Sequence, residues 1–167
     1  MIEELYTATK KFLGITIEVV CSLNGVRQIL INRNLDSEKF SGLIQVSVND
    51  NKLFNVFTQL DEYFFRQRKN FNLPLEINGT DFQKAVWKEL IKIPYGKTLS
   101  YNQLAIRLGD KKSVRAVAAA NGANPLPIVI PCHRVIGSDG NLVGYGGGLD
   151  VKQKLLELEG NRSMSLF

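Results

Sequence analysis

The sequence predicts an α/β fold of the α+β type, with a small sheet-plus-helix domain followed by a helical domain that contains a helix-turn-helix. Three observations support this prediction. Residues 4–32 are rich in β-branched and aromatic residues, residues 80–160 carry repeated helix-capping patterns, and residues 70–79 between them have no clear period. A chain of 167 residues is long enough to form two small cores. The expected domains are residues 1–76 and 77–167.

The first domain is expected to be a small sheet covered by one helix. Asn24-Gly25 marks a hairpin, because Asn and Gly tolerate the positive φ of a tight turn. Apolar residues recur at helical spacing over 51–67, which predicts an amphipathic helix packed on the sheet. Cys21 falls within a strand and is expected to be a packed core thiol. The expected strands are 5–9, 15–21, 26–31 and 43–48, with a turn over 10–14 between the first two.

Helix starts in the second domain are marked by capping boxes, in which a Ser or Thr is followed three residues later by Gln. Thr80 with Gln83 and Ser100 with Gln103 fit this pattern, and Asp150 with Gln153 resembles it at the start of a last helix, 150–159. The first of these helices is expected to end at Pro94-Tyr95-Gly96. Its apolar face is expected to consist of Phe82, Val86, Leu90 and Ile93.

A short helix after Ser100 and a third helix over 114–121 are joined by a polar turn, which is the helix-turn-helix pattern. Ser113 is expected to cap the third helix. Residues 116 and 118–120 are all alanine, so this helix has almost no side-chain bulk. It could pack tightly in a core, or it could approach a DNA groove closely with Arg115 projecting from its start. The residues alone leave both possibilities open.

The net charge of +5 is unevenly distributed. Residues 1–75 carry nine Lys and Arg against eight Asp and Glu, whereas residues 76–167 carry twelve against eight. Within 84–115, eight basic residues face only Glu89 and Asp110. Such a block is often a solvated surface, and it is also the electrostatic pattern of a nucleic-acid-binding face.

The composition excludes several classes of protein. No window approaches 18 uncharged apolar residues, so we expect no membrane partner, and the start of the chain lacks the features of a signal peptide. Two cysteines make no disulfide framework. A single histidine with two cysteines supplies too few ligands for a zinc site, so no metal is expected. A cytoplasmic protein with reduced thiols fits best.

The segment Ile128-Val129-Ile130-Pro131-Cys132-His133-Arg134-Val135 is the strongest candidate for chemistry. The apolar run and Pro131 place Cys132 on a stiff segment. His133 and Arg134 follow directly, and either could hold the sulfur as a thiolate by lowering the usual cysteine pKa of about 8.5. The alternative is an inert buried thiol. Against it, His133 is the only histidine in the chain and adjoins one of only two cysteines.

Residues 137–148 form a glycine-rich loop without the spacing of a phosphate-binding loop. Its glycines are expected to let the backbone approach a flat ligand closely, with Tyr145 as the one large contact. Glu159 is expected at the C-terminal end of the last helix, where a carboxylate is mildly unfavourable. It is either exposed there or held in place as a partner of His133.

Taken together, the motifs of residues 79–160 resemble those of the O6-alkylguanine-DNA alkyltransferases, also called methylated-DNA–protein-cysteine methyltransferases. The N-terminal 75 residues are similar to that family only in size and coarse pattern. The resemblance implies an RNase H-like N-terminal domain there. It rests on Pro131-Cys132-His133-Arg134-Val135, Gly79-Thr80-Asp81-Phe82-Gln83, Ile93-Pro94-Tyr95-Gly96, Ser100-Tyr101, Arg115-Ala116-Val117, Asn124-Pro125 and the glycine-rich loop with Tyr145.

The resemblance implies a DNA-repair enzyme, a methylated-DNA–[protein]-cysteine S-methyltransferase that acts once. Cys132 would take a methyl or small alkyl group irreversibly from O6 of guanine, with O4 of thymine as a second possible source. His133, a bridging water and Glu159 would activate the thiol. Tyr101 would either donate to the O6 leaving group or push out the 3′ phosphate during base flipping.

The resemblance also assigns the contacts to DNA. Arg115 would fill the space that the flipped base leaves, and Asn124 would brace the turn between recognition helix and active site. The guanine pocket would be lined by Val135, Tyr145, Gly146 and Gly147. The helix-turn-helix would bind the minor groove of double-stranded DNA containing O6-alkylguanine through Ser113, Arg115, Ala116, Ala119, Ala120 and Asn121.

Two features depart from patterns that are common in the family. Some members carry a structural zinc in the N-terminal domain, which the single histidine disfavours here. Gly146 stands where the related loop often has Ser, so one contact to the base oxygen would come from backbone only. The resemblance implies no cofactor and no obligate protein partner, and a monomer is the default.

Three other functions fit parts of the sequence. A damage-sensing binder would keep the pocket without the nucleophile, but Cys132 is retained. A Cys-His hydrolase would need an oxyanion loop, and none is evident in the sequence. A plain helix-turn-helix regulator would leave Cys132 without a role.

Overall fold

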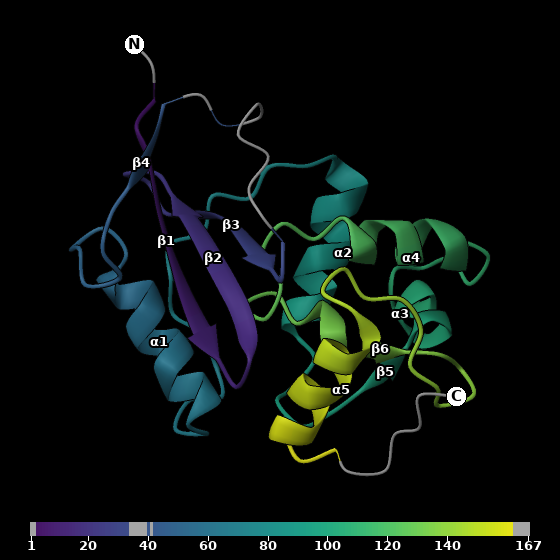
Figure 1. The fold of residues 1–167 in the computed structure, drawn as a ribbon. Coiled ribbons are helices and arrows are strands. Elements are labelled where there is room, and N and C mark those ends of the chain that lie inside the picture. Colours follow the sequence, from purple (N-terminus) through teal and green to yellow (C-terminus); the bar gives the residue numbers. More distant parts are fainter. Residues whose placement is uncertain (1–2, 34–39, 41, 162–167) are drawn as a thin grey trace. The chain divides into compact units, whose positions relative to one another are not determined.

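The computed structural model describes residues 3–33, 40 and 42–161, and the chain divides into two compact units, 1–77 and 78–167. The first unit has a four-stranded sheet in the order β3-β2-β1-β4. Its strands are β1 (Leu5–Phe12), β2 (Ile15–Cys21), β3 (Val26–Ile31) and β4 (Leu43–Gln45). The first three pair antiparallel in sequence order, and β4 pairs parallel with β1. The predicted sheet is confirmed (Figure 1).

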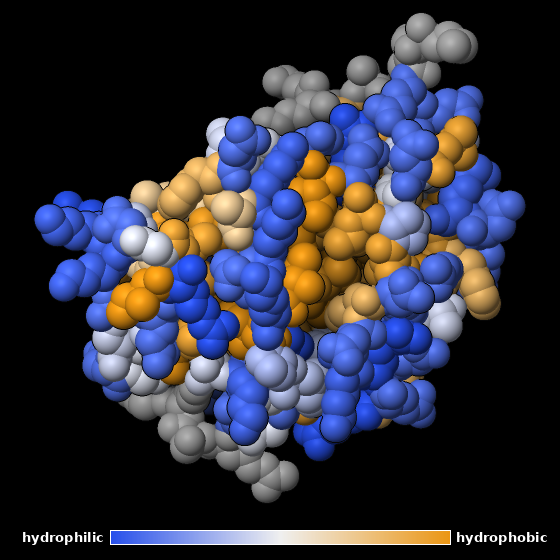
Figure 2. Space-filling model, turned by 180° about the vertical axis from the view of Figure 1, so that it is seen from behind, coloured by the Kyte–Doolittle hydropathy of each residue, from blue (hydrophilic) through white to orange (hydrophobic). Residues whose placement is uncertain are grey.

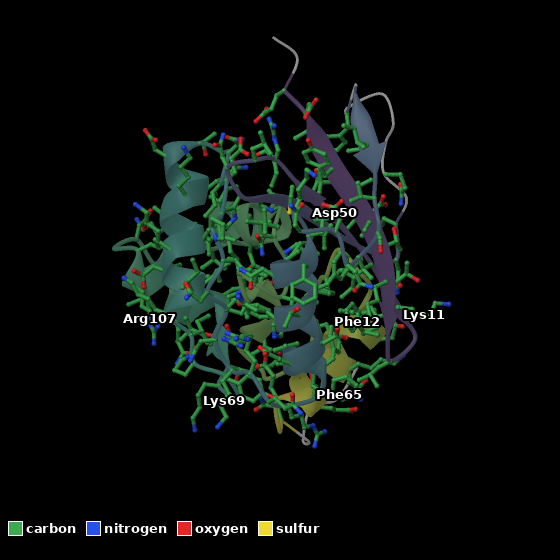
Figure 3. The ribbon with its side chains drawn as sticks, turned by 90° about the vertical axis from the view of Figure 1, so that its left-hand side faces the viewer. Lys11, Phe12, Asp50, Phe65, Lys69 and Arg107 are labelled. Atoms are coloured by element: carbon green, nitrogen blue, oxygen red, sulfur yellow. The ribbon has the colours of Figure 1, made fainter. Side chains whose placement is uncertain are left out.

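Helix α1 (Phe54–Phe64) covers this sheet, as predicted, although it is shorter than the expected 51–67. Val56, Phe57 and Leu60 are buried, and the ring of Phe64 stacks on Phe12 of β1 with centroids 4.7 Å apart. Figure 3 shows Phe12 near the end of β1 and Lys11 extending away from the sheet. The alternation of inward Phe12 and outward Lys11 is the period-two pattern of a half-buried strand.

Three details of the first unit differ from expectation. The turn between β1 and β2 is not the segment 10–14 but only Leu13-Gly14, both with positive φ as a tight hairpin requires. The last expected strand ends at Gln45 rather than at 48, and Ile44 on this edge strand is 39% exposed. Residues 74–76 are not a free linker, since they pair with Val26 through backbone hydrogen bonds.

The backbone of Pro74 lies so close to Gly25 in the Asn24-Gly25 hairpin that it accounts for the glycine better than turn geometry alone. A Cβ on Gly25 would lie 2.4 Å from the carbonyl oxygen of Pro74, so any side chain there would push that segment away. The hairpin is therefore as predicted, and the glycine also permits close approach of two backbones.

The second unit is helical with one short parallel pair of strands. Its helices are α2 (Asp81–Ile91), α3 (Tyr101–Arg107), α4 (Val114–Gly122) and α5 (Leu149–Leu158), with a 3₁₀ turn η1 (Cys132–Arg134). Strands β5 (Leu99–Ser100) and β6 (Val135–Ile136) pair with Leu99 opposite Val135. No local pattern predicted this pair, and it places the start of α3 beside the segment that carries Cys132.

The capping boxes at Thr80 and Ser100 are confirmed in both directions, with each side-chain oxygen accepting from the backbone three residues on. The other two expected caps are wrong. Ser113 donates its hydroxyl to the carbonyl oxygen of Asp110 instead of capping α4, and α5 begins at Leu149 after Gly148, so Asp150 lies inside the helix.

The buried face of α2 also differs in one position. Val86, Leu90 and Ile93 are buried as expected, but Phe82 is 41% exposed. Trp87, which was not expected on the buried face, is buried instead, and its indole Nε1 donates to the carbonyl oxygen of Ala120 at 2.9 Å. This bond joins α2 to α4, the second helix of the expected helix-turn-helix.

Other large apolar side chains are exposed, including Leu13, Leu23 and Phe65. The face in Figure 2 shows hydrophobic residues among hydrophilic ones, as on most protein surfaces. None of the helices in the described residues is long and apolar enough to cross a membrane.

Candidate active site

Cys132 is 5% exposed and begins the η1 turn. The preceding chain is held in place by Asn124, whose side-chain amide donates to the carbonyl oxygen of Ile130 at 2.8 Å and accepts from the backbone of Leu126 at 2.9 Å. Ile128 has a φ of 75°, which is a strained value for a β-branched residue. Such strain persists where the surrounding structure enforces it, often at functional sites. The sulfur of Cys132 therefore lies on a rigid loop that is held by several contacts.

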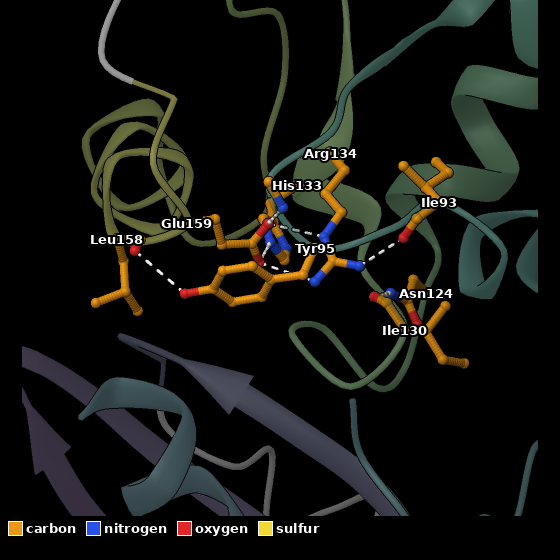
Figure 4. Close-up of polar contacts among 9 residues, drawn as sticks. Ile93, Tyr95, Asn124, Ile130, His133, Arg134, Leu158 and Glu159 are labelled. Atoms are coloured by element: carbon orange, nitrogen blue, oxygen red, sulfur yellow. Dashed lines mark hydrogen bonds and ion pairs between the residues drawn. The ribbon is translucent and has the colours of Figure 1, made fainter. Parts of the chain in front are cut away.

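A buried polar cluster lies next to Cys132 in the chain (Figure 4). It consists of His133 and Arg134, which directly follow the thiol in sequence, and Glu159. The Nε2 atom of His133 lies 2.8 Å from Oε1 of Glu159. Arg134 donates two hydrogen bonds to the same carboxylate, from Nε to Oε2 and from Nη2 to Oε1, each at 2.9 Å. Its third nitrogen, Nη1, donates to the carbonyl oxygen of Ile93 at 2.6 Å. Of the two alternatives for Glu159, the partner of His133 is the observed one.

Gly96 provides a further hydrogen bond to the carboxylate of Glu159. Its backbone N–H donates to Oε2 of Glu159 at 3.1 Å, and its φ is +75°. A Cβ at this position would lie 2.9 Å from the backbone oxygen of Glu159. Glycine is therefore required both for the turn and for the approach of the helix end.

The cluster fixes the protonation states. Burial alone would raise the pKa of Glu159, but hydrogen bonds from His133 and Arg134, together with the positive charge of Arg134, outweigh it and hold that pKa well below its usual range. Burial lowers the pKa of His133 more than Glu159 raises it. The imidazole is thus neutral at pH 7, with its one proton on Nε2 facing the carboxylate. Its Nδ1 atom is left as a buried acceptor with no hydrogen-bond partner in the described protein.

Cys132 rests as a neutral thiol and not as the thiolate that the sequence suggested. Burial raises the pKa of Cys132, and this effect exceeds the opposing ones from Asn124 and Lys152. Arg134 was one of two groups that could have held the sulfur as an anion, but its guanidinium donates to Glu159 and to the carbonyl oxygen of Ile93. The resting site is therefore a neutral thiol beside a neutral imidazole, and a proton must leave the sulfur before it can attack.

The hydroxyl of Tyr101 lies at the start of α3, 3.3 Å from the amide nitrogen of Asn121. That nitrogen is also 3.5 Å from the carbonyl oxygen of Cys132. Burial raises the pKa of Tyr101, and an ionised Cys132 would add to the effect. Asn121 therefore connects the hydroxyl of Tyr101 with the backbone of Cys132, while the catalytic role of Tyr101 stays a prediction.

Lys152 was missed in the sequence. Its Nζ atom donates to the backbone oxygens of Val143 at 2.9 Å and Gly144 at 3.3 Å, and lies 5.9 Å from the ring centroid of Tyr101. Burial lowers its pKa to about 8, although an ionised Cys132 would act in the opposite direction. The sequence did contain a pattern that could have identified it. Lys152 precedes Glu159 by two helical turns, so the two side chains lie on the same face.

The remaining predicted pocket residues take different positions. Val135 is fully buried in β6, whereas Gly146 is exposed and Gly147 is half-buried in the loop. The hydroxyl of Tyr145 is buried without a partner among the described residues, and burial raises its pKa well above the usual value. An unpaired buried hydroxyl is costly unless a ligand satisfies it.

The predicted DNA-binding positions separate into two groups on α4. Arg115, Ala116 and Ala119 are exposed, and Ser113 is half-buried at its start. Ala120 and Asn121 are 3% and 4% exposed on the inner face, so their assignment to the DNA surface is corrected. The helix thus has small residues packed inside, as the first interpretation expected, and small residues exposed outside, where close approach to a DNA groove stays a prediction.

Comparison with known proteins follows this division of the chain. Residues 5–77 match the ribonuclease-like domain of 6-O-methylguanine DNA methyltransferase, and residues 81–161 match the DNA-binding domain of 6-O-methylguanine DNA methyltransferase. A methylated-DNA–protein-cysteine methyltransferase of Methanosarcina barkeri is 47% identical over 133 residues, which cover 77% of this chain and 84% of that one. An inducible protein of the same name from Bacillus subtilis is 46% identical over 129 residues, or 77% and 72% of the two chains.

Solved structures give the same result. The crystal structure of the Mycobacterium tuberculosis O6-methylguanine methyltransferase has a TM-score of 0.84 at 34% identity, covering 95% of this chain and 94% of that chain. A second structure of a protein from that organism, in complex with DNA, has the same TM-score and identity over 94% of both chains. The resemblance seen in the motifs is confirmed: this chain belongs to the 6-O-methylguanine DNA methyltransferase family.

Proposed function

We propose that this protein repairs DNA by moving a methyl or other small alkyl group from O6 of guanine to Sγ of Cys132. The observation that carries the proposal is the buried sequence of groups at the site. A thiol is followed by an imidazole whose Nδ1 is an acceptor without a partner in the described part of the chain and whose Nε2 is hydrogen-bonded to an ionised carboxylate. A relative in the family is solved with DNA, and the named relatives are methyltransferases acting on a protein cysteine.

The reaction balances without a cofactor. The proton of the Cys132 thiol passes to Nδ1 of His133, directly or through water, and the thiolate attacks the alkyl carbon in line with the C–O6 bond. The S–C bond forms while the C–O6 bond breaks, and its electron pair goes to guanine, which then takes up one proton. Because a thioether forms, the sulfur is not regenerated and each molecule reacts once.

Glu159 and Arg134 support the proton transfer. The carboxylate stabilises the imidazolium that forms on His133, and Arg134 keeps that carboxylate ionised and oriented. In a buried site these charges act strongly, since little water screens them. Tyr101 is proposed to donate its hydroxyl proton toward the leaving base, and Asn124 to hold the loop of Cys132 in place.

DNA would be bound by the helix-turn-helix of α3 and α4. The exposed small residues Ala116 and Ala119 allow close approach of α4 to a groove, and Arg115 beside them can occupy the space of the flipped base. Extrusion of a base costs a few kcal/mol, which such a side chain can offset. The pocket for the base would be lined by Val135, Tyr145 and the backbone of Gly146 and Gly147. A reducing, cytoplasmic location is part of the proposal, because both cysteines are free thiols.

The test is intact-mass spectrometry after incubation with duplex DNA containing one O6-methylguanine. We expect one added methyl group per protein chain and no further addition when DNA is in excess. The same duplex with unmodified guanine is the control. A protein that binds the lesion tightly but keeps its mass would be a damage sensor, and the proposal would be wrong.

A further inference from the structure

Asn121 lies between Tyr101 and the Cys132 backbone, although it was expected on the DNA surface. It is 4% exposed on the inner face of α4. Its amide nitrogen is 3.3 Å from the hydroxyl oxygen of Tyr101 and 3.5 Å from the carbonyl oxygen of Cys132. Its Oδ1 atom has no partner among the described residues. The side chain is thus held at the site through its nitrogen alone.

The neighbours fix which way the amide points. A backbone carbonyl oxygen can only accept, so the atom of Asn121 that faces Cys132 must be the nitrogen. The opposite orientation would set two acceptors against each other and leave the NH₂ group without a partner. In the observed orientation one N–H of Asn121 also points at the hydroxyl oxygen of Tyr101, which accepts it.

This contact determines where the hydroxyl proton of Tyr101 can go. One lone pair of the oxygen is taken by Asn121, so the O–H bond points elsewhere. Among the described residues, the acceptor within reach is the carbonyl oxygen of Val143, at 3.5 Å, the weak limit of a hydrogen bond. That oxygen already accepts from Lys152 at the shorter distance of 2.9 Å. The proton of Tyr101 is therefore only loosely held within the protein.

We infer that Asn121 is a positioning residue for alkyl transfer: its amide turns the hydroxyl of Tyr101 into a donor aimed at the departing base. This inference rests on the proposed function and on Tyr101 acting as a donor in it. An amide donor also stabilises the ionised form of the phenol, and its hydrogen bond acts to lower the pKa of Tyr101 against the larger effect of burial. Asn121 would thus both orient the hydroxyl and make its proton easier to give.

A double-mutant cycle on the full-length protein tests the inference. Single-turnover transfer from excess O6-methylguanine duplex is measured for the wild type, Asn121→Leu, Tyr101→Phe and the double variant. One neutral hydrogen bond corresponds to a rate loss of roughly two- to tenfold, which we expect for Asn121→Leu alone. In the Tyr101→Phe background the same substitution should change the rate less than about twofold, because the hydroxyl it positions is gone.

Two further variants separate positioning from packing. Asn121→Ala runs the same cycle in case leucine disturbs the fold. Val117→Ala removes bulk from the buried face of α4 one turn earlier, and we expect its effect on the rate to be equal in both backgrounds. Equal losses from Asn121→Leu with and without the Tyr101 hydroxyl would overturn the inference and leave the proposed function intact. A Tyr101→Phe variant as fast as the wild type would also overturn it. A wild type that transfers no methyl group would instead refute the proposed function.

Discussion

Apart from substitution of Cys132 itself, removal of the charge on Glu159 is the change from which we expect the largest effect on stability and activity. The carboxylate faces Arg134 and His133, which are 5% and 0% exposed. Glu159→Gln keeps the shape of the side chain and removes its charge, which leaves the buried guanidinium of Arg134 uncompensated. Breaking one side of a buried ion pair costs about 3–5 kcal/mol of folding free energy. We expect a loss in this range, because Arg134 holds both carboxylate oxygens.

Chemical denaturation followed by circular dichroism measures this loss, and Glu157→Gln is the matched control. Glu157 lies on the same helix, is exposed and contacts Gln153, so its substitution should change stability by less than about 0.5 kcal/mol. The transfer rate of Glu159→Gln should also fall, since neutral His133 loses the partner that stabilises its protonated form. DNA affinity should change little, because Glu159 is buried.

The stability difference should depend on pH in a defined direction. The pKa of Glu159 is lowered by folding, so its contribution is present above the ordinary carboxyl value of 4.5 and is lost as the pH falls toward the folded-state value. Wild type and Glu159→Gln should therefore converge in stability as the pH is taken below about 4. If Glu159→Gln unfolds like Glu157→Gln at neutral pH, the carboxylate does not hold Arg134 and the proposed activation of His133 is wrong.

Three other predictions follow from the structure. In a Cys21→Ala background, a small neutral alkylating reagent should modify Cys132 slowly at pH 7 and faster only above the ordinary thiol pKa, because burial raises the pKa of Cys132; full reactivity at pH 6 would show a resting thiolate. Arg115→Ala should slow repair in duplex DNA more than in short single strands, while Arg107→Ala should affect both alike; equal losses from Arg115→Ala would make it a phosphate contact only. Thr80→Ala should cost about 1 kcal/mol of unfolding free energy and Thr80→Ser almost none, since the cap needs only a hydroxyl; equal denaturation midpoints would contradict the cap.

Local patterns in the sequence predicted the parts of the fold that depend on neighbouring residues. The boxes at Thr80 and Ser100 formed because each cap and its glutamine are three residues apart in one helix start. Ser113 had the right residue type, but the turn offered its hydroxyl the nearer carbonyl of Asp110. The face of α4 could not be assigned because alanines carry almost no hydrophobic pattern, and Val117 alone did not fix the phase.

The identities of Cys132, His133 and Glu159 were readable from the motif, but their charges were not. Adjacency in sequence suggested that Arg134 would stabilise a thiolate. The fold instead turns its guanidinium to Glu159, and burial then favours the neutral thiol. These effects depend on the solvent exposure of each group and on contacts across 25 residues or more, such as that from Arg134 to Glu159, which no local pattern encodes.

The transfer of a methyl group to one defined sulfur is the central claim, and peptide mapping tests it most directly. The protein is reacted with duplex DNA containing O6-methylguanine, digested, and analysed by mass spectrometry for the peptides that contain Cys21 and Cys132. We predict a methyl group on the Cys132 peptide, none on the Cys21 peptide, and no methylation of the Cys132→Ser variant, which should still bind the damaged duplex. Methylation of Cys21, or of the Cys132→Ser variant at any position, would contradict the assignment of Cys132 as the acceptor.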